Sequence, residues 1–165
     1  MKTSVMRAHD SENPVSGAAV RSVFDLVDLG PFQNNQNNVL AINDVGQRAG
    51  VSFNEETGRV EAFLELRGTR MMLGTLGGSF SIARGINNRG EIVGGSLSRG
   101  DDDFHGFLYR NGKLHDLNDL LQPDSGWELV QAVAINDNGE IIGIGSNHGA
   151  DRVVLLTPRA QQKVG

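Results

Sequence analysis

The chain has 165 residues, of which 38% are hydrophobic and 21% charged, and this composition is typical of one globular domain with its own core. Its net charge of −5, without any cluster of lysine or arginine, argues against nucleic-acid binding, which needs a concentrated basic face. The absence of cysteine excludes disulfide bonds, thiolate chemistry and cysteine-based zinc sites.

No segment approaches the roughly 18 consecutive apolar residues that a membrane-spanning helix needs, so no membrane span is expected. Residues 1–19 are polar and lack the apolar centre of a signal peptide, although a signal removed from a longer precursor is compatible with this sequence. We expect a flexible tail over residues 1–21, a single domain over residues 22–158 and a C-terminal tail over residues 159–165.

The first predicted element is a short strand from Val23 to Leu29, which mixes apolar and acidic residues. An amide-rich run from Gln33 to Asn38 follows it as a polar connection. Because amide side chains recognise sugar hydroxyls, Asn35 in this run is a candidate ligand-binding residue. A flexible loop is the simpler interpretation of the same run.

A seven-residue pattern built around an Ile-Asn pair and a glycine then occurs three times. The three copies are Ala41–Gln47, Gly85–Glu91 and Ala134–Glu140. Their asparagines lie 44 and then 49 residues apart. Three matches to one pattern at similar intervals predict a chain of three diverged tandem repeats.

Each copy predicts four short antiparallel strands, and the second copy is the clearest. Asn-Arg-Gly and Asn-Gly turns supply the left-handed backbone that tight hairpins need, while Gly94 and Gly95 permit a close approach or a bulge. Four such strands in about 45 residues have the size of one β-propeller blade, so we predict an all-β, β-propeller-like fold of three four-stranded repeats. The strands of the second copy are expected at Ser81–Asn87, Glu91–Ser96, Phe104–Tyr109 and Lys113–Leu117.

The third copy ends after its third strand, near Thr157-Pro158, so the N-terminal strand Val23–Leu29 is predicted to complete this last repeat. Three blades are fewer than the four to eight that are usual for propellers. Two chains would form a six-bladed ring in which each N-terminal strand completes a blade of its partner, and we therefore expect a homodimer. A closed three-bladed monomer is the alternative.

The segment from Leu73 to Gly94 resembles the HAF-type repeat of bacterial extracellular proteins, whose hallmark is a His-Ala-Phe-Leu-Trp stretch before an x-Gly hairpin. The hallmark is matched here by His105–Tyr109 and by Glu61–Glu65, whereas Arg152–Leu156 departs furthest from it. The resemblance covers roughly residues 22–158. It implies a β-propeller-like array and an extracellular or periplasmic location, and it transfers no catalytic residue.

The repeated turn residues are candidate metal ligands, because their oxygen atoms would converge if the first strands line a central channel. Carboxylate and amide oxygens suit Ca²⁺, which makes a calcium site one hypothesis. The other hypothesis is that these residues cap backbone N–H groups of their own hairpins, and repetition in every copy favours it. The set consists of Asn43, Asn87 and Asn136 with their neighbours Asp44, Asn88 and Asp137.

Two further candidate ligand-binding residues lie in segments that are not repeated. Asp102 belongs to the acidic loop Asp101–Asp103 near His105, where a cation would relieve the repulsion of three carboxylates, although a solvated hairpin tip is the simpler interpretation. Trp127 is the only tryptophan and lies in an insertion of the third copy. An exposed Trp127 would stack on a sugar or another flat ligand, and a buried one would fill the core.

The leading functional hypothesis is a module that binds a small molecule, a glycan or a protein partner through loops on a rigid scaffold. The alternative is a calcium-dependent hydrolase of a lactone or ester, by analogy with propeller lactonases. In that enzyme Asp44 or Asp137 would act as ligand or base, and His105 would accept a proton. A third interpretation is a structural piece of a longer extracellular array. Whether the chain is an enzyme is left open by the sequence.

Overall fold

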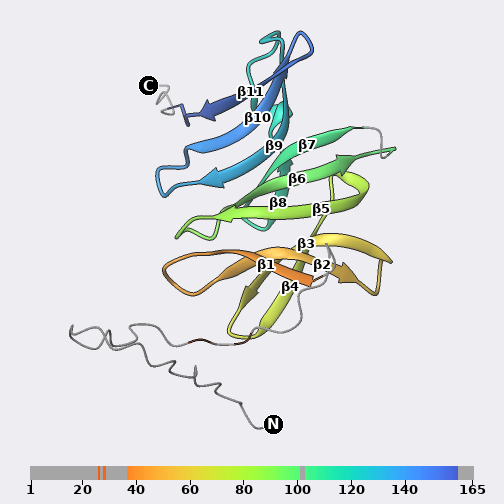
Figure 1. Ribbon diagram of the computed structural model, residues 1–165, viewed down its shortest axis with the longest axis vertical. Coiled ribbons are helices and arrows are strands. Elements are labelled where there is room, and N and C mark those ends of the chain that lie inside the picture. The colour runs from red at the N-terminus through yellow and green to blue at the C-terminus, as the bar shows by residue number, and fades with distance from the viewer. Residues whose placement is uncertain (1–25, 27, 29–36, 101–102, 160–165) are drawn as a thin grey trace, which may run out of the picture. The chain divides into compact units, whose positions relative to one another are not determined.

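The computed structural model describes residues 26, 28, 37–100 and 103–159, and Figure 1 gives its architecture. The chain divides into two units, Met1–Pro31 and Phe32–Gly165, and every described strand belongs to the second. Besides the strands, the described residues contain a single 3₁₀ turn, η1 (Asn118–Leu120), and no α-helix. The strands are β1 (Asn37–Ile42), β2 (Arg48–Asn54), β3 (Arg59–Leu66), β4 (Thr69–Gly74), β5 (Gly77–Ile86), β6 (Ile92–Ser98), β7 (Phe104–Arg110), β8 (Lys113–Asp116), β9 (Trp127–Ile135), β10 (Ile141–Asn147) and β11 (Ala150–Leu156).

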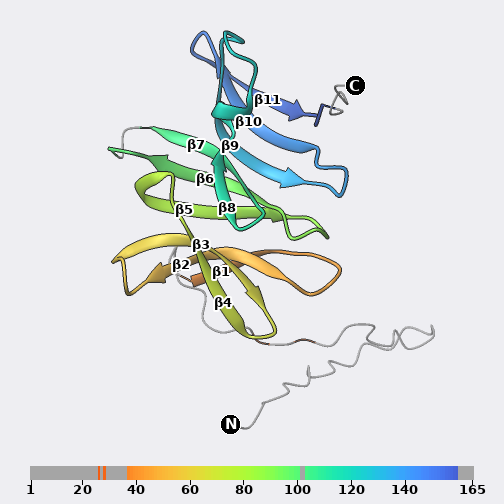
Figure 2. The same ribbon diagram turned by 180° about the vertical axis from the view of Figure 1, so that it is seen from behind.

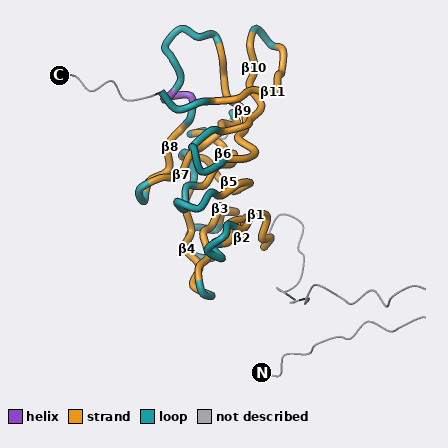
Figure 3. The backbone as a smooth tube through the Cα atoms, turned by 90° about the vertical axis from the view of Figure 1, so that its left-hand side faces the viewer, coloured by secondary structure: helices purple, strands orange, loops and turns teal. Residues whose placement is uncertain are grey.

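The strands pair mainly with their neighbours in the chain and form three strand groups. β1 to β4 pair consecutively and antiparallel, as do β5 to β8, while β9, β10 and β11 form a separate sheet. One parallel pair, Val60 with Phe80, joins β3 to β5 and makes an eight-stranded sheet of the first two groups. We call β1–β4, β5–β8 and β9–β11 the first, second and third strand groups. They lie one above another in the ribbon views and in the tube view (Figures 1, 2 and 3).

This arrangement confirms the predicted all-β class with mainly antiparallel strands. The sheets of the described residues close neither into a barrel nor into a ring. Of the strand expected at Val23–Leu29, only Leu26 and Asp28 lie within the described residues, and neither belongs to a strand. The other residues of that expected strand lie outside the part of the chain that the structure describes.

The hairpin turns follow the glycines and asparagines of the sequence. Gly46, Gly90 and Gly139 have φ angles of 79°, 73° and 80°, the left-handed region that favours glycine. Asn111 and Gly112 also have positive φ, at 54° and 77°, as the Asn-Gly turn between β7 and β8 requires. The turns therefore fix the hairpins where the sequence predicted them.

Two apolar clusters fill the space between successive strand groups. Because neighbouring residues of a strand point to opposite faces of the sheet, Ile92 and Val93 of β6 enter different clusters. Burial of such a side chain contributes about 1.5–3 kcal/mol, so apolar packing holds the groups together. The first cluster contains Ala49, Ala62, Ala83, Ile86, Ile92, Phe107 and Tyr109, and the second contains Val93, Leu108, Leu117, Leu129, Ala132 and Ile141.

Charged side chains replace apolar ones on the face of the first group that points away from the second. Arg48 and Glu65, which are paired across β2 and β3, form an ion pair at 2.5 Å. Arg70 adds a second ion pair to Glu65 at 2.8 Å and stacks on the ring of Phe63 at 3.9 Å. The equivalent positions of the second group are apolar and belong to the first cluster. The outer face of the first group is therefore more polar than the corresponding face of the second group.

Candidate functional site

A groove of about 650 Å³ lies between β9–β11 and the connection that follows η1, and we call it the tryptophan groove. Its lining is mainly apolar, with Leu121, Trp127 and Leu129 on one side and residues 152–156 of β11 on the other. It runs along the edge of β11 that has no partner strand among the described residues. A concave apolar site of this size suits a small molecule.

Trp127 is neither a core residue nor a free surface residue. It begins β9 with its side chain 40% exposed, and its backbone N–H donates to Ser125 Oγ at 3.3 Å. The ring lies against Gly145 of β10, where an added Cβ would stand 3.2 Å from Trp127 Cε3. Packing on a glycine holds the ring in place and leaves part of it open to the groove.

Polar groups at the edge of the groove are few. Gln122 and Ser125 come from the connection after η1, Glu128 from β9 and Arg152 from β11. Arg152 is exposed and has no ion pair within the residues that the structure describes. An apolar lining with a few polar groups at its edge orients a ligand as well as burying it.

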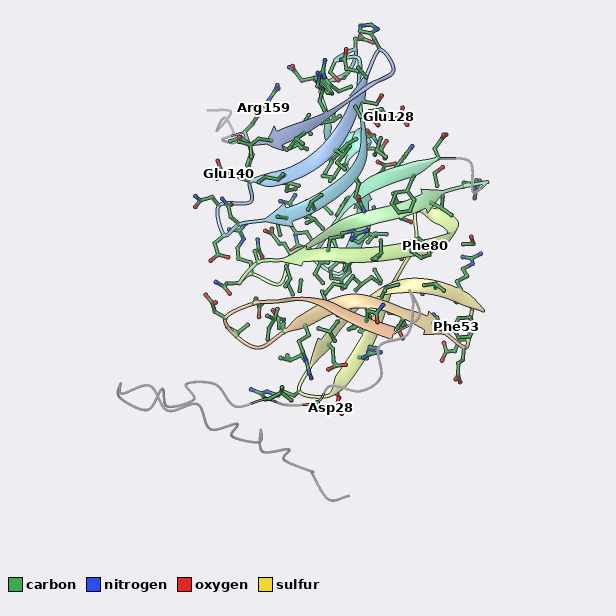
Figure 4. All side chains as sticks on the ribbon, viewed as in Figure 1. Asp28, Phe53, Phe80, Glu128, Glu140 and Arg159 are labelled. Atoms are coloured by element: carbon green, nitrogen blue, oxygen red, sulfur yellow. The ribbon has the colours of Figure 1, made fainter. Side chains whose placement is uncertain are left out.

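His105 lies close to one of these polar groups. Its Nδ1 is 2.6 Å from Asp116 Oδ2, and its Nε2 is 3.7 Å from Glu128 Oε1. The other oxygen of Asp116 accepts the backbone N–H of Asn118 at 2.9 Å, which fixes the carboxylate. β7, β8 and β9 thus each supply one member of this cluster. Glu128, which Figure 4 labels, also lines the tryptophan groove and so connects the two.

The partner of His105 on the neighbouring strand is an aspartate and not the other histidine of the hairpin. His115 lies on the neighbouring strand, yet it pairs with Leu108, and it is Asp116 that reaches His105. A carboxylate on Nδ1 orients the ring and leaves Nε2 for a second group, which is the arrangement of an oriented general base. In this structure the second group is Glu128, so the cluster joins the second strand group to the third.

The repeated asparagines brace the turns of their own hairpins. Asn87 Oδ1 accepts the backbone N–H groups of Arg89 and Glu91, both at 3.0 Å, and its Nδ2 donates to Glu91 Oε2 at 2.6 Å. Asn136 makes the same three bonds within its own turn. Asn43 likewise accepts from the backbone N–H of Gln47 and donates to its side chain.

The same asparagines also join each turn to the turn of the next strand group. Asn43 Nδ2 donates to the carbonyl of Asn87 at 2.9 Å, and Asn87 Nδ2 donates to the carbonyl of Asn136 at 3.1 Å. A parallel row runs through the following residue of each turn: the backbone N–H of Asp44 donates to Asn88 Oδ1, and that of Asn88 donates to Asp137 Oδ1, both at 2.8 Å. We call these two rows, made by Asn43, Asn87, Asn136, Asp44, Asn88 and Asp137, the asparagine ladder.

The ladder uses the oxygen atoms that the calcium hypothesis requires. Both lone pairs of Asn87 Oδ1, and both of Asn136 Oδ1, face backbone N–H groups, so a cation there would have to open the turns. No group of three or more His, Asp or Glu side chains that could hold a metal ion occurs among residues 37–100 and 103–159. The geometry therefore favours the hairpin-capping hypothesis for these residues.

The two aspartates that were candidate catalytic residues also belong to the ladder. Asn88 Nδ2 donates to Asp44 Oδ2 at 2.9 Å and to Asp137 Oδ2 at 2.8 Å, so one amide bridges both carboxylates. His105 pairs instead with Asp116, which belongs to another cluster. The hypothetical catalytic set is thus divided between the ladder and the His105 cluster.

The remaining candidates from the sequence are placed less completely. Asn35 and Asp102 lie outside the described residues. Asp103, which follows Asp102, is exposed, and its carbonyl accepts the backbone N–H of Ser98 at 2.9 Å. Of the candidate ligand-binding residues, Trp127 alone is described and lines a groove.

Two carboxylates of the ladder region have shifted pKa values. Burial of the Glu91 carboxyl raises its pKa, but hydrogen bonds from Asn87 and Arg89 and the charges of Arg89 and Arg110 outweigh this and hold the pKa below 4.5. The backbone and side-chain N–H groups of Asn88 hold the pKa of Asp137 below 3.8. Both groups are therefore bound more favourably as carboxylates.

We expect Glu91→Gln to reduce the loss of stability in acid. A carboxyl whose pKa is lower in the folded than in the unfolded chain contributes stability above its unfolded pKa, and this contribution is lost as the pH falls through the folded pKa. The free energy of unfolding of the unmodified chain should therefore drop below about pH 4.5, more steeply than that of the variant. Urea unfolding across this pH range measures the difference. Glu55→Gln, in the exposed turn after β2, is the matched control, and equal slopes for all three chains would contradict the prediction.

The fold and the groove together define an all-β chain of stacked strand groups with a small-molecule-sized site at one end. Comparison of the chain with protein-family models, with curated proteins and with solved structures found no match. Within the described residues, no helix is long and apolar enough to cross a membrane.

Proposed function

We propose that the chain is a binding module that holds a small molecule with a flat apolar face and an anionic group in the tryptophan groove. The observation that carries this proposal is the half-exposed ring of Trp127, which is fixed on Gly145 at the wall of an apolar groove of about 650 Å³. A large apolar side chain is normally buried, and one held rigid at the wall of a cavity loses little entropy when a ligand stacks on it.

The lining of the groove defines the chemistry of the ligand. The indole of Trp127 offers a flat apolar face, and the aliphatic side chains of Leu121, Val154 and Leu156 enclose the space beside it. Arg152 at the edge can pair with a carboxylate, sulfonate or phosphate. Glu128 has a cationic partner in His105 whenever that ring is protonated, so it opposes an anionic ligand less than an isolated carboxylate would.

We further propose that the three strand groups are three diverged repeats of one propeller-like unit. The ladder supports this, because equivalent turn residues repeat the same bonds at separations of 44 and 49 residues. The resemblance to the HAF-type repeat extends the proposal to a bacterial, extracytoplasmic setting.

Calorimetric titration with 8-anilinonaphthalene-1-sulfonate tests the groove, because this probe combines a flat apolar ring system with one anionic group. Trp127→Ala should weaken binding about tenfold or more, since loss of an aromatic contact of 1.4 kcal/mol corresponds to a factor of ten. Trp127→Phe should retain most of the affinity because it keeps a flat ring. Arg152→Gln should weaken binding through loss of the ionic contact.

Phe53→Ala is the matched control for the titration, because Phe53 is another half-exposed aromatic residue, at the far end of β2 (Figure 4). This variant should bind the probe as the unmodified chain does. Trp127→Ala should also unfold at nearly the same temperature as the unmodified chain, since its ring is 40% exposed. Unchanged affinity in Trp127→Ala would refute the proposed site, and a large loss of stability would make Trp127 a core residue.

A further inference from the structure

The third strand group has an apolar face that nothing described covers. Its residues Ile142, Val153 and Leu155 are 47%, 82% and 63% exposed. Ile142 pairs with Leu155 across β10 and β11 in the way that Val93 pairs with Leu108 across β6 and β7. Val93 and Leu108 are buried against the third group, whereas their equivalents in the third group have no group beyond them.

The first strand group has an apolar residue without a packing partner at the other end of the stack. Ile86 of β5 is buried against the first group, in a cluster with Ala49 and Ala62. Its equivalent in the first group, Ile42, precedes the ladder residue Asn43 in the same way but is 67% exposed. Ile42 at one end of the stack and Val153 at the other are therefore left without a further strand group to pack against, and the ion-paired side chains of Arg48 and Glu65 lie on the same face as Ile42.

The ends of the asparagine ladder are complementary in their hydrogen bonding. At the Asn136 end, Nδ2 donates within its own turn but finds no carbonyl of a further turn among the described residues, and the backbone N–H of Asp137 is equally free there. At the Asn43 end, the carbonyl of Asn43 accepts only from its own turn. Donors are thus left at one end and acceptors at the other, and a head-to-tail neighbour of the same kind would pair with both in place of water.

We infer that a second copy of this chain stacks its first strand group on the third strand group of its partner and continues the asparagine ladder across the interface. In such a pair the first strand group of each copy contacts the third strand group of the other. Two copies that make both contacts at once form a closed ring of six strand groups. The surface lies mainly on the opposite face of the third group from the one that Trp127 covers, because Trp127 lies on the side of Val154 and neighbouring residues of β11 alternate. At the edge of β11, Val153 and Leu155 border the tryptophan groove as well.

Part of the interface is polar, and this sets its strength. Besides Ile42, the face of the first group carries the ion-paired side chains of Arg48, Glu65 and Arg70, which are 25%, 11% and 30% exposed. An interface with an apolar centre and a polar remainder associates reversibly. We therefore expect pairing that depends on concentration.

Sedimentation equilibrium of the full chain over a wide range of concentration tests the inference. The mass should approach that of two chains, and a single-chain mass at every concentration would overturn the inference, while species larger than two chains would overturn closure. Val153→Asp and Ile42→Asp should each give single chains without loss of folding, because both side chains are mostly exposed in one copy. Phe53→Asp, which leaves both end faces intact, should still pair.

Mixing the two single-chain variants separates head-to-tail stacking from every other mode of pairing. A chain carrying Ile42→Asp keeps an intact third group, and one carrying Val153→Asp keeps an intact first group. The mixture should therefore recover pairs through the one intact contact, and failure to recover them would overturn the head-to-tail arrangement. Circular dichroism verifies that each variant folds, and Val153→Ser is the milder substitute if Val153→Asp does not. Because the readout is mass, its failure is distinguishable from a failure of ligand binding in the tryptophan groove.

Discussion

Replacement of Asn87 by alanine is expected to lower the free energy of unfolding by about 4 kcal/mol, because buried N–H groups left without an acceptor cost about 1–3 kcal/mol each. The side chain is 3% exposed and accepts the backbone N–H groups of Arg89 and Glu91. Its loss also removes a donor from Glu91 Oε2 and breaks the bond to the carbonyl of Asn136. Urea unfolding followed by the fluorescence of Trp127 measures the effect.

Asn136→Ala is the matched control for this prediction. Asn136 braces its turn with the same bonds, but it is exposed and ends the ladder, so water replaces much of what is lost. We expect a cost of about 1 kcal/mol, the net contribution of an ordinary hydrogen bond. Equal losses for Asn87→Ala and Asn136→Ala would contradict a ladder whose stability depends on burial between strand groups.

Gly94→Ala is expected to cost at least about 3 kcal/mol, at the upper end of the effects of overpacking. A Cβ at this position would stand 1.9 Å from the carbonyl oxygen of Ile82 and 2.9 Å from Phe107 Cε1. The carbonyl belongs to the backbone of β5, the partner strand, which cannot move without breaking the pairing. The substituted chain should unfold at much lower urea concentration or fail to fold.

Gly145→Ala is the control for the loss at Gly94. A Cβ there would stand 3.2 Å from Trp127 Cε3, a side chain that can shift by a few tenths of an ångström at the wall of an open groove. We expect a cost of about 1 kcal/mol or less, within the range of ordinary substitutions. Comparable losses of stability for Gly94→Ala and Gly145→Ala would show that contact with the backbone is not what excludes a side chain at position 94.

Much of the fold could be predicted because its signals are local. Asn-Gly and Asn-x-x-Gly segments require a left-handed backbone whatever surrounds them, so the turns after Asn87 and Asn111 identified the hairpins of the second strand group. The predicted strands Phe104–Tyr109 and Lys113–Leu117 differ from β7 and β8 only at their ends. The glycines of β6 were correctly associated with close approach of the neighbouring strand.

The site was harder to predict, because it depends on contacts between residues far apart in the sequence. Repetition identified Asn43, Asn87 and Asn136, but repetition alone cannot distinguish a shared metal from a ladder, since both need the same side chain in every copy. The distinction depends on where each amide nitrogen finds its acceptor, and that acceptor is a backbone carbonyl 44 or 49 residues away. No side-chain pattern marks a backbone carbonyl.

His105 and Trp127 were named from the sequence, but their partners, Asp116 and Gly145, were not predicted, for a related reason. The register of the β7–β8 hairpin places Asp116 opposite Phe107 and His115 opposite Leu108, so Asp116 shares a face with His105 and reaches it diagonally. The Asn111-Gly112 turn contains the information needed to set this register, and a count outward from it would have placed Asp116 and His105 diagonally on one face. The groove, by contrast, needs Trp127 to pack on Gly145, a contact between strands that no local signal predicts.

A series of ¹⁵N–¹H correlation spectra recorded during titration, first with calcium and then with 8-anilinonaphthalene-1-sulfonate, tests most directly whether the ladder is structural and the groove binds. The predicted result is no calcium-dependent change in the side-chain amides of Asn43, Asn87 and Asn136. The anionic probe should then shift the indole N–H of Trp127 together with the backbone of β11. A calcium-dependent shift of the three asparagine amides, with no response of Trp127 to the probe, would contradict both assignments.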